Sequence, residues 1–140
     1  MLITKTQDYA IRIMRMLYAT EKAQAKEIAE AENIPPTFVS TIIPHLSHAG
    51  LVKSTKGRSV GGHMLAKPAA EITLYDVLSA LDPDFCISHC TRSDYSCAMN
   101  RGTNICYVHN EICRIQSVLV QELQRKNLEE LFRGEDRIAE

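Results

Sequence analysis

The sequence contains no apolar stretch approaching the ~18 residues of a membrane-spanning helix, and its first residues lack the charged and apolar regions of a secretory leader. It has no internal repeat, no low-complexity tract, no phosphate-binding loop and no nucleophile paired with a base. These absences argue against a membrane protein, a secreted protein, a hydrolase and a transferase. For 140 residues we expect one compact domain, or one domain with an extended appendage, located in the cytoplasm.

A strong net charge is also missing. The formal net charge is -1, which by itself argues against a nucleic-acid binder. The charge is unevenly distributed, however, because residues 1–67 hold nine Lys and Arg against five Asp and Glu, whereas residues 68–140 hold seven against twelve. The mildly basic first half can meet phosphates while the acidic half faces elsewhere.

Cysteine is absent from the first 85 residues, and all five cysteines then fall within 28 residues. They are Cys86, Cys90, Cys97, Cys106 and Cys113, and His109 follows Cys106 by three residues. Disulfide frameworks are rare in the cytosol, where clustered cysteines more often bind metal or sense redox state. Five thiols and an imidazole on one polar stretch therefore favour a soft metal centre.

The first half of the chain has the pattern of a helix-turn-helix. Apolar residues recur at three- and four-residue spacing over residues 6–20, and Thr4 with Gln7 fits a capping box at the start of this helix. A short helix is expected at residues 25–31. The turn at residues 33–36 then restarts a helix with proline in its first turn.

The third helix is the candidate recognition helix. Its core stripe is Val39, Ile42, Ile43 and Leu46, and its outward residues are Thr37, Ser40, Thr41, His45 and His48. Pro44 removes the amide that would bond to the Ser40 carbonyl, at a cost of about 3 kcal/mol unless the helix kinks. Two outcomes stay open: Pro44 kinks the helix and changes how it lies in a major groove, or it shortens the helix. Gly50 closes the helix.

Two short strands, at residues 51–55 and 63–66, are joined by a glycine-rich basic hairpin at residues 56–62. A helix-turn-helix followed by a hairpin is a winged helix. Arg58 at the tip is expected to enter a narrow minor groove, and Lys5, Lys53 and Lys56 to hold phosphates. Thr37, Ser40, Thr41 and His45 are weaker candidates, because direct readout favours Arg, Lys, Asn or Gln and polar helix faces are often only solvated.

The second half begins with a well-specified helix. Thr73 and Asp76 form a capping box, and Ile72 with Val77 fits a hydrophobic staple, so this helix should run to about Leu81. Residues 84–105 lack periodicity. A stripe at spacings of four and three then predicts a helix roughly 24 Å long, sufficient for pairing with a second copy; it consists of Val108, Ile112, Ile115, Leu119 and Leu123.

The expected fold is mainly α with a small β-hairpin: a winged helix-turn-helix plus a long C-terminal dimerisation helix. Residues 1–81 would form the DNA-binding domain and residues 82–106 a cysteine-rich cluster-binding loop. Residues 107–140 would form the dimerisation helix and a short last helix that begins near Asn127 and Glu130.

With these features, the chain resembles the bacterial IscR/NsrR-type winged-helix repressors, many of which carry an iron-sulfur cluster. The resemblance covers nearly the whole chain. It is carried by Thr4-Lys5-x3-Tyr9-Ala10, Ile28-Ala29-Glu30, Ile34-Pro35, Leu46-x3-Gly50-Leu51-Val52, Gly61-Gly62, Ile72-Thr73-x3-Val77 and Cys106-x2-His109.

The resemblance implies cluster ligands but leaves their identity open. Such proteins space three cysteines by about five or six residues, which Cys90, Cys97 and Cys106 keep best, although eight residues separate the last two. Cys86 is the rival for the first place, because Leu81-Asp82-x3-Cys86 resembles the stretch before the first cysteine of the family. Cys113 is interpreted as a packing or accessory thiol.

A fourth, harder ligand is expected from one of two residues. His109 resembles the IscR ligand, and Asp8 occupies the place where some NsrR-like relatives use an acidic residue of the partner's first helix. Both residues also have plain structural explanations. A carboxylate is favoured in a first helical turn, and His109 is a polar residue at a helix start.

The sequence therefore predicts a homodimeric transcription regulator, not an enzyme, that binds a double-stranded DNA operator. It would sense redox state, nitric oxide or iron-sulfur status through a [2Fe-2S] or [4Fe-4S] cluster. One alternative is a cluster-free winged-helix regulator that uses its cysteines for zinc or thiol redox sensing. The other is a small electron carrier, which the winged helix disfavours.

Overall fold

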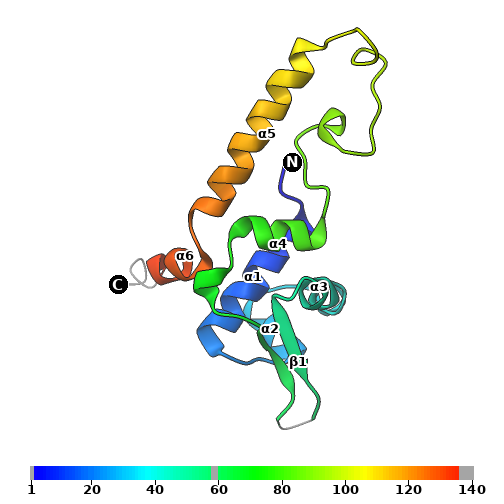
Figure 1. Cartoon of the computed structure of the whole chain (residues 1–140). Coiled ribbons are helices and arrows are strands. Elements are labelled where there is room, and N and C mark those ends of the chain that lie inside the picture. The colour runs from blue at the N-terminus through cyan, green and yellow to red at the C-terminus, as the bar shows by residue number, and fades with distance from the viewer. Residues whose placement is uncertain (1, 58–59, 136–140) are drawn as a thin grey trace.

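The computed structural model describes residues 2–57 and 60–135, so Arg58 lies outside the described residues. No helix in the described part is long and apolar enough to cross a membrane. The elements in chain order (Figure 1) are α1 (Lys5–Thr20), α2 (Ala25–Ala31), α3 (Pro36–His48), β1 (Val52–Thr55), β2 (Gly62–Leu65), the 3-10 turn η1 (Ala69–Glu71), α4 (Leu74–Leu81), the 3-10 turn η2 (His89–Thr91), α5 (Tyr107–Arg125) and α6 (Leu128–Glu135).

The start of α1 is set by the predicted capping box. The Gln7 amide donates to the Thr4 hydroxyl (3.2 Å), and the Thr4 amide donates to Oε1 of Gln7 (2.9 Å). The Gln7 side chain is buried, and its Nε2 donates to the carbonyl of Leu78 at 3.3 Å. One glutamine therefore both caps α1 and ties it to α4.

The helix-turn-helix is formed by α2 and α3. The four predicted core residues of α3 are all buried, and the helix continues through Pro44 to His48. The expectation that Pro44 shortens the helix is therefore wrong. Helical bonding resumes beyond the proline, where the Ala49 amide donates to the His45 carbonyl (3.1 Å), and the buried Leu46 anchors this last turn in the core.

The wing is an antiparallel hairpin in which Val52 pairs with Leu65 and Thr55 with Gly62. A third segment joins its base, because Ala23 and His63 exchange both backbone hydrogen bonds, at 3.0 and 2.8 Å. Burial at this junction lowers the pKa of His63. The hairpin is thus paired to the chain that links α1 and α2, as a winged helix requires.

The C-terminal helix α6 returns to the N-terminal domain. Leu128 is fully buried, and its amide donates to the Ile72 carbonyl at 2.8 Å. Phe132 is also buried and lies 5.6 Å from the ring of Tyr18 on α1. The last helix therefore completes the core of the winged helix, although the sequence pattern groups it with the dimerisation helix.

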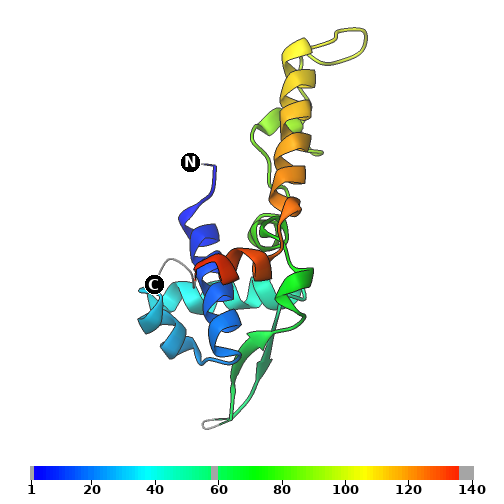
Figure 2. The same ribbon diagram turned by 90° about the vertical axis from the view of Figure 1, so that its left-hand side faces the viewer.

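The long helix α5 extends away from this body, and the hairpin lies at the opposite end of the molecule (Figures 1 and 2). None of the residues of α5 is buried. Large apolar side chains are exposed along it, namely Tyr107, Val108, Ile115 and Val118. The cysteine-containing segment between α4 and α5 runs beside this helix in both views.

Candidate functional site

The cysteine loop (residues 82–106) is attached to α5 by one side chain. Nε2 of Gln116 donates to the Phe85 carbonyl at 2.9 Å, and its Oε1 accepts from the Ile87 amide at 2.9 Å. The ring of Phe85 is buried. Cys86 therefore lies between two backbone positions that Gln116 holds against the long helix.

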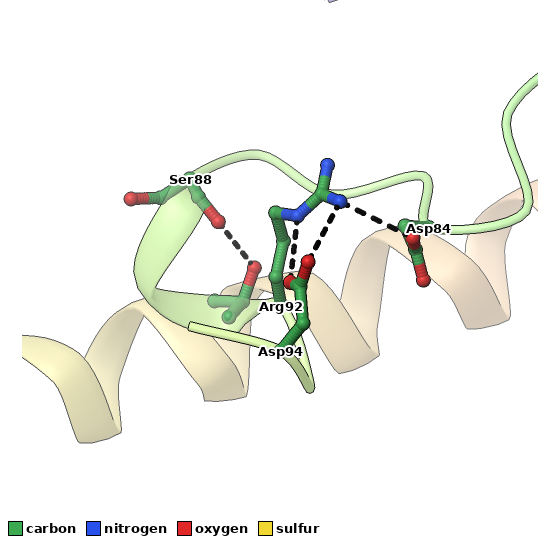
Figure 3. A network of polar contacts seen from close by, with 5 residues as sticks. Asp84, Ser88, Arg92 and Asp94 are labelled. Atoms are coloured by element: carbon green, nitrogen blue, oxygen red, sulfur yellow. Dashed lines mark hydrogen bonds and ion pairs between the residues drawn. The ribbon is translucent and has the colours of Figure 1, made fainter. Parts of the chain in front are cut away.

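A second attachment lies within the loop, at Arg92 (Figure 3). Its guanidinium binds Asp94 at 3.0 Å and Asp84 at 3.3 Å, so it joins residues on either side of η2. The hydrogen bond to Asp94 raises the pKa of Arg92 and lowers the pKa of the Asp94 carboxyl. The Thr91 hydroxyl also donates to the Ser88 carbonyl at 2.7 Å. These contacts give the first half of the loop a defined shape.

A cavity of about 380 Å³ lies between the loop and α5. The loop contributes Cys90 and Cys97 to its lining, and α5 contributes His109 and Cys113. The remaining lining residues are Thr91, Arg92, Tyr95, Ser96 and Asn100. Three thiols and an imidazole, two donors from the loop and two from α5, thus face one space.

The two donors on α5 are close to each other. Sγ of Cys113 lies 3.5 Å from Nε2 of His109, one helical turn earlier. Cys106 has a different environment, because it is the N-cap of α5 and its Sγ accepts from the His109 amide at 3.4 Å. Among the described residues, Cys86 and Cys106 are not part of the cavity lining.

Asp8 lies on α1, apart from this cavity. Its carboxylate pairs with Arg12 at 2.9 Å in an i, i+4 contact on the helix surface. The structure of one chain therefore brings His109, and not Asp8, to the cysteines.

The donor set fits a soft metal centre in chemical type. All five cysteines are free thiols and partly buried, and thiolate with imidazole is a ligand set suited to zinc and to iron-sulfur clusters. The donors do not all converge. In the ranges 2–57 and 60–135, no three Cys, His, Asp or Glu side chains lie close enough together to share one ion.

The predicted DNA-binding residues of α3 share its outer face. The four side chains are all exposed, opposite the buried stripe of the helix: Thr37, Ser40, Thr41 and His45. The Thr41 hydroxyl donates to the Thr37 carbonyl at 2.9 Å, so it already has a partner within the helix. Polar groups on this face are therefore available for contact, but they are small and few.

The predicted phosphate contacts lie around this helix. Nζ of Lys5 is 5.7 Å from the centre of the Tyr9 ring, which meets the ring of Phe38 on α3 edge-on at 5.2 Å. Lys5 is thereby held beside the start of α3. Lys53 on β1 and Lys56 beyond it are exposed on the wing. Lys22, which is not among the predicted phosphate contacts, donates a hydrogen bond from Nζ to the Val60 carbonyl of the wing.

A family model described as Rrf2, iron-dependent transcriptional regulator, matches residues 3–134. The chain belongs to the Rrf2 family. It is 29% identical to the HTH-type transcriptional regulator NsrR of Oceanobacillus iheyensis, over 97% of this chain and 92% of that protein. The resemblance inferred from sequence is therefore confirmed.

Solved structures of the family share the fold. CymR, described as the global cysteine regulator of B. subtilis, is 24% identical with a TM-score of 0.74, covering 94% of this chain and 96% of that one. T. potens IscR is 19% identical with the same TM-score, covering 94% of this chain and 86% of that one. The mainly helical winged-helix fold with a two-stranded hairpin is confirmed, and the relatives are transcriptional regulators rather than enzymes.

Two residues that hold the loop in place were not expected from sequence. Gln116 and Arg92 carry no recognisable pattern, since a glutamine on a helix and an arginine in a loop are common on any surface. Cys113, whose position within the long helix favours a packing or accessory thiol, is placed by the structure in the cavity lining. Its position four residues after His109 was the available signal, since residues at this spacing share a helix face.

Proposed function

We propose that this protein is a homodimeric transcription regulator, acting as a repressor, that senses redox state, nitric oxide or iron-sulfur status through an iron-sulfur cluster. The observation that carries the proposal is the cavity between the cysteine loop and α5, lined by Cys90, Cys97, His109 and Cys113. Its setting in a winged-helix protein of an iron-dependent regulator family supports a role in controlling DNA binding.

A bound cluster would supply a soft, redox-active centre whose charge and ligation change with its chemical state. Cys90 and Cys97 would hold it together with either Cys106 or Cys113, and His109 would be the harder fourth ligand. Cys86 and the partner's copy of Asp8 are the rival ligands. A hard ligand leaves more readily than a thiolate, so a change at the cluster can release the loop.

A route from the loop to the DNA-binding surface runs through α4. The loop leaves the end of α4, and α4 packs on both α1 and α3. Gln116 fixes the same part of the loop to α5. A displacement of residues 85–87 would therefore act on α5, which we propose as the dimer helix, and on the helix that supports α3.

We propose that two winged helices of the dimer read a pseudo-palindromic operator, because the symmetry of such proteins matches that of their sites. The outer face of α3 would enter the major groove through Thr37, Ser40, Thr41 and His45. Lys5, Lys53 and Lys56 would hold phosphates, and Arg58 would reach the minor groove from the wing. The exposure of the described members of this set supports the assignment.

Anaerobic reconstitution with iron and sulfide tests the cluster. Wild-type protein should take up iron and show visible absorbance, and Cys97→Ala should abolish both. Operator duplexes selected from a random library should then bind the loaded and unloaded wild-type protein with different affinities. A wild-type protein that takes up no iron, or a Cys97→Ala variant that loads normally, would contradict the cluster.

A cluster-free regulator is the second candidate, and a specific observation favours it. Five free, partly exposed thiols lie in one segment, and no three donors within the described residues converge on one point. Zinc gives no visible bands, so a colourless protein with one equivalent of zinc would support a zinc site. A metal-free protein whose DNA affinity falls on treatment with diamide would support thiol redox sensing.

A further inference from the structure

The pair formed by His109 and Cys113 has the geometry of two ligands on one metal ion. Tetrahedral bonds of about 2.3 Å to sulfur and about 2.1 Å to nitrogen place the two donor atoms about 3.6 Å apart. The observed distance from Sγ of Cys113 to Nε2 of His109 is 3.5 Å. The i, i+4 spacing is the one by which two side chains of a helix bind the same ion in helical zinc motifs.

Cys106 is used differently. Its Sγ accepts the hydrogen bond from the His109 amide at 3.4 Å, which satisfies one of the free amides at the start of α5. Cys113 lines the cavity with Cys90 and Cys97, whereas Cys106 is not among the described lining residues. The helix therefore directs Cys113 toward the other donors and uses Cys106 as a cap.

We propose that Cys113 is a metal ligand that acts with His109 as one half of the centre, while Cys90 and Cys97 supply the other half. Cys106 serves as the N-cap of α5. This inference rests on the proposed function, because it assumes that the cysteine loop holds a metal centre. His109 and Cys113 already lie 3.5 Å apart on α5, and Cys90 and Cys97 line the same cavity from the loop.

Two serine substitutions separate the roles of the two cysteines. Serine is a good N-cap but a poor ligand for a soft metal. Cys106→Ser therefore keeps the cap and should keep the metal site. Cys113→Ser makes the same change nearly two turns into the helix and should lose the site; the Cys113 side chain is partly exposed and is not part of the hydrophobic core.

The probe is Co²⁺, titrated anaerobically into the full-length protein and followed by its thiolate-to-metal charge-transfer absorbance. Loss of an outer-shell partner alone costs 10–100-fold in affinity, so Cys113→Ser should weaken Co²⁺ binding by at least about 100-fold. Cys106→Ser should bind within about threefold of the wild type. Cys113→His, which supplies a nitrogen donor in place of sulfur, should recover binding with a weaker charge-transfer band.

The outcomes distinguish the inference from the function on which it rests. Wild-type protein that binds neither Co²⁺ nor iron overturns both. Wild-type binding that survives in Cys113→Ser but is lost in Cys106→Ser overturns the inference alone and assigns Cys106 to the centre. Circular dichroism of the four proteins in the absence of metal should be alike, which shows that the difference lies in the ligands.

Discussion

Gly61 shows how the absence of one side chain shapes the wing. A Cβ at this position would lie 2.1 Å from the Gly57 carbonyl oxygen and 2.9 Å from that of Thr55. The Gly61 amide also donates to the Gly57 carbonyl at 2.9 Å, which closes the hairpin. The tight approach of the two strands at the wing thus depends on glycine at residue 61.

We expect Gly61→Ala to disrupt the wing and weaken operator binding, because the new methyl group collides with backbone that cannot move aside without opening the hairpin. The free energy of unfolding should fall by roughly 1–3 kcal/mol, as in other overpacked positions. Chemical denaturation and duplex titration measure the two effects. Gly134→Ala is the matched control, since a Cβ there meets nothing within 4 Å. Equal stability and affinity in Gly61→Ala and wild type would contradict this account.

At the scale of elements, the cysteine loop is joined to α5 by side chains rather than by secondary structure. The two hydrogen bonds of Gln116 reach 31 and 29 residues back along the chain. Arg92 ties Asp84 to Asp94 within the loop. The beginning of the loop is therefore held against α5 by contacts of the protein alone.

Gln116→Ala should loosen this attachment. Each hydrogen bond contributes about 1 kcal/mol, so exchange of the Ile87 amide with solvent deuterium should accelerate by roughly tenfold or more. Thermal unfolding of the winged helix should change little, since Gln116 lies outside its core. Gln124→Ala, an exposed glutamine on the same helix, is the control. Unchanged exchange at Ile87 would show that Gln116 does not hold the loop.

At the scale of the whole molecule, α5 is a 19-residue helix without a buried residue. Ile115 and Val118 are 43% and 46% exposed, and Val108 is 68% exposed. A helix in a protein gains most of its stability from burying an apolar face. We therefore infer that a second copy covers this face, which also gives the two-fold symmetry of the proposed operator.

Dimerisation through α5 predicts that Ile115→Glu combined with Leu119→Glu yields monomers, because four carboxylates would then meet across the interface. Operator binding should weaken as well, because each half-site would be bound by a separate monomer. Sedimentation at micromolar concentration measures the first effect. Gln121→Glu adds charge at an exposed position of the same helix and should leave the dimer intact. A wild-type protein that sediments as a monomer contradicts the interface.

The winged helix could be predicted from sequence because its signals are local. The capping boxes at Thr4 and Thr73, the core stripe of α3 and the glycines of the wing each specify their own segment within a few residues. Such patterns need no knowledge of distant contacts. The types of metal donor could also be predicted from sequence, because five cysteines and His109 lie within residues 86–113.

Only the tertiary structure decided how these parts meet. Residues 84–105 have no periodicity, so the sequence does not show where Cys90 and Cys97 lie relative to α5; their place depends on Gln116, on the contacts of Arg92 and on the face of α5 that they approach. The return of α6 to Ile72 depends on a backbone bond between residues 56 positions apart, and no local pattern encodes it. Cys106 and Cys113 differ in position because Cys106 is the N-cap of α5, with extended backbone dihedrals, whereas Cys113 lies within the helix; the residue at which the helix begins decides which thiol caps it and which lines the cavity.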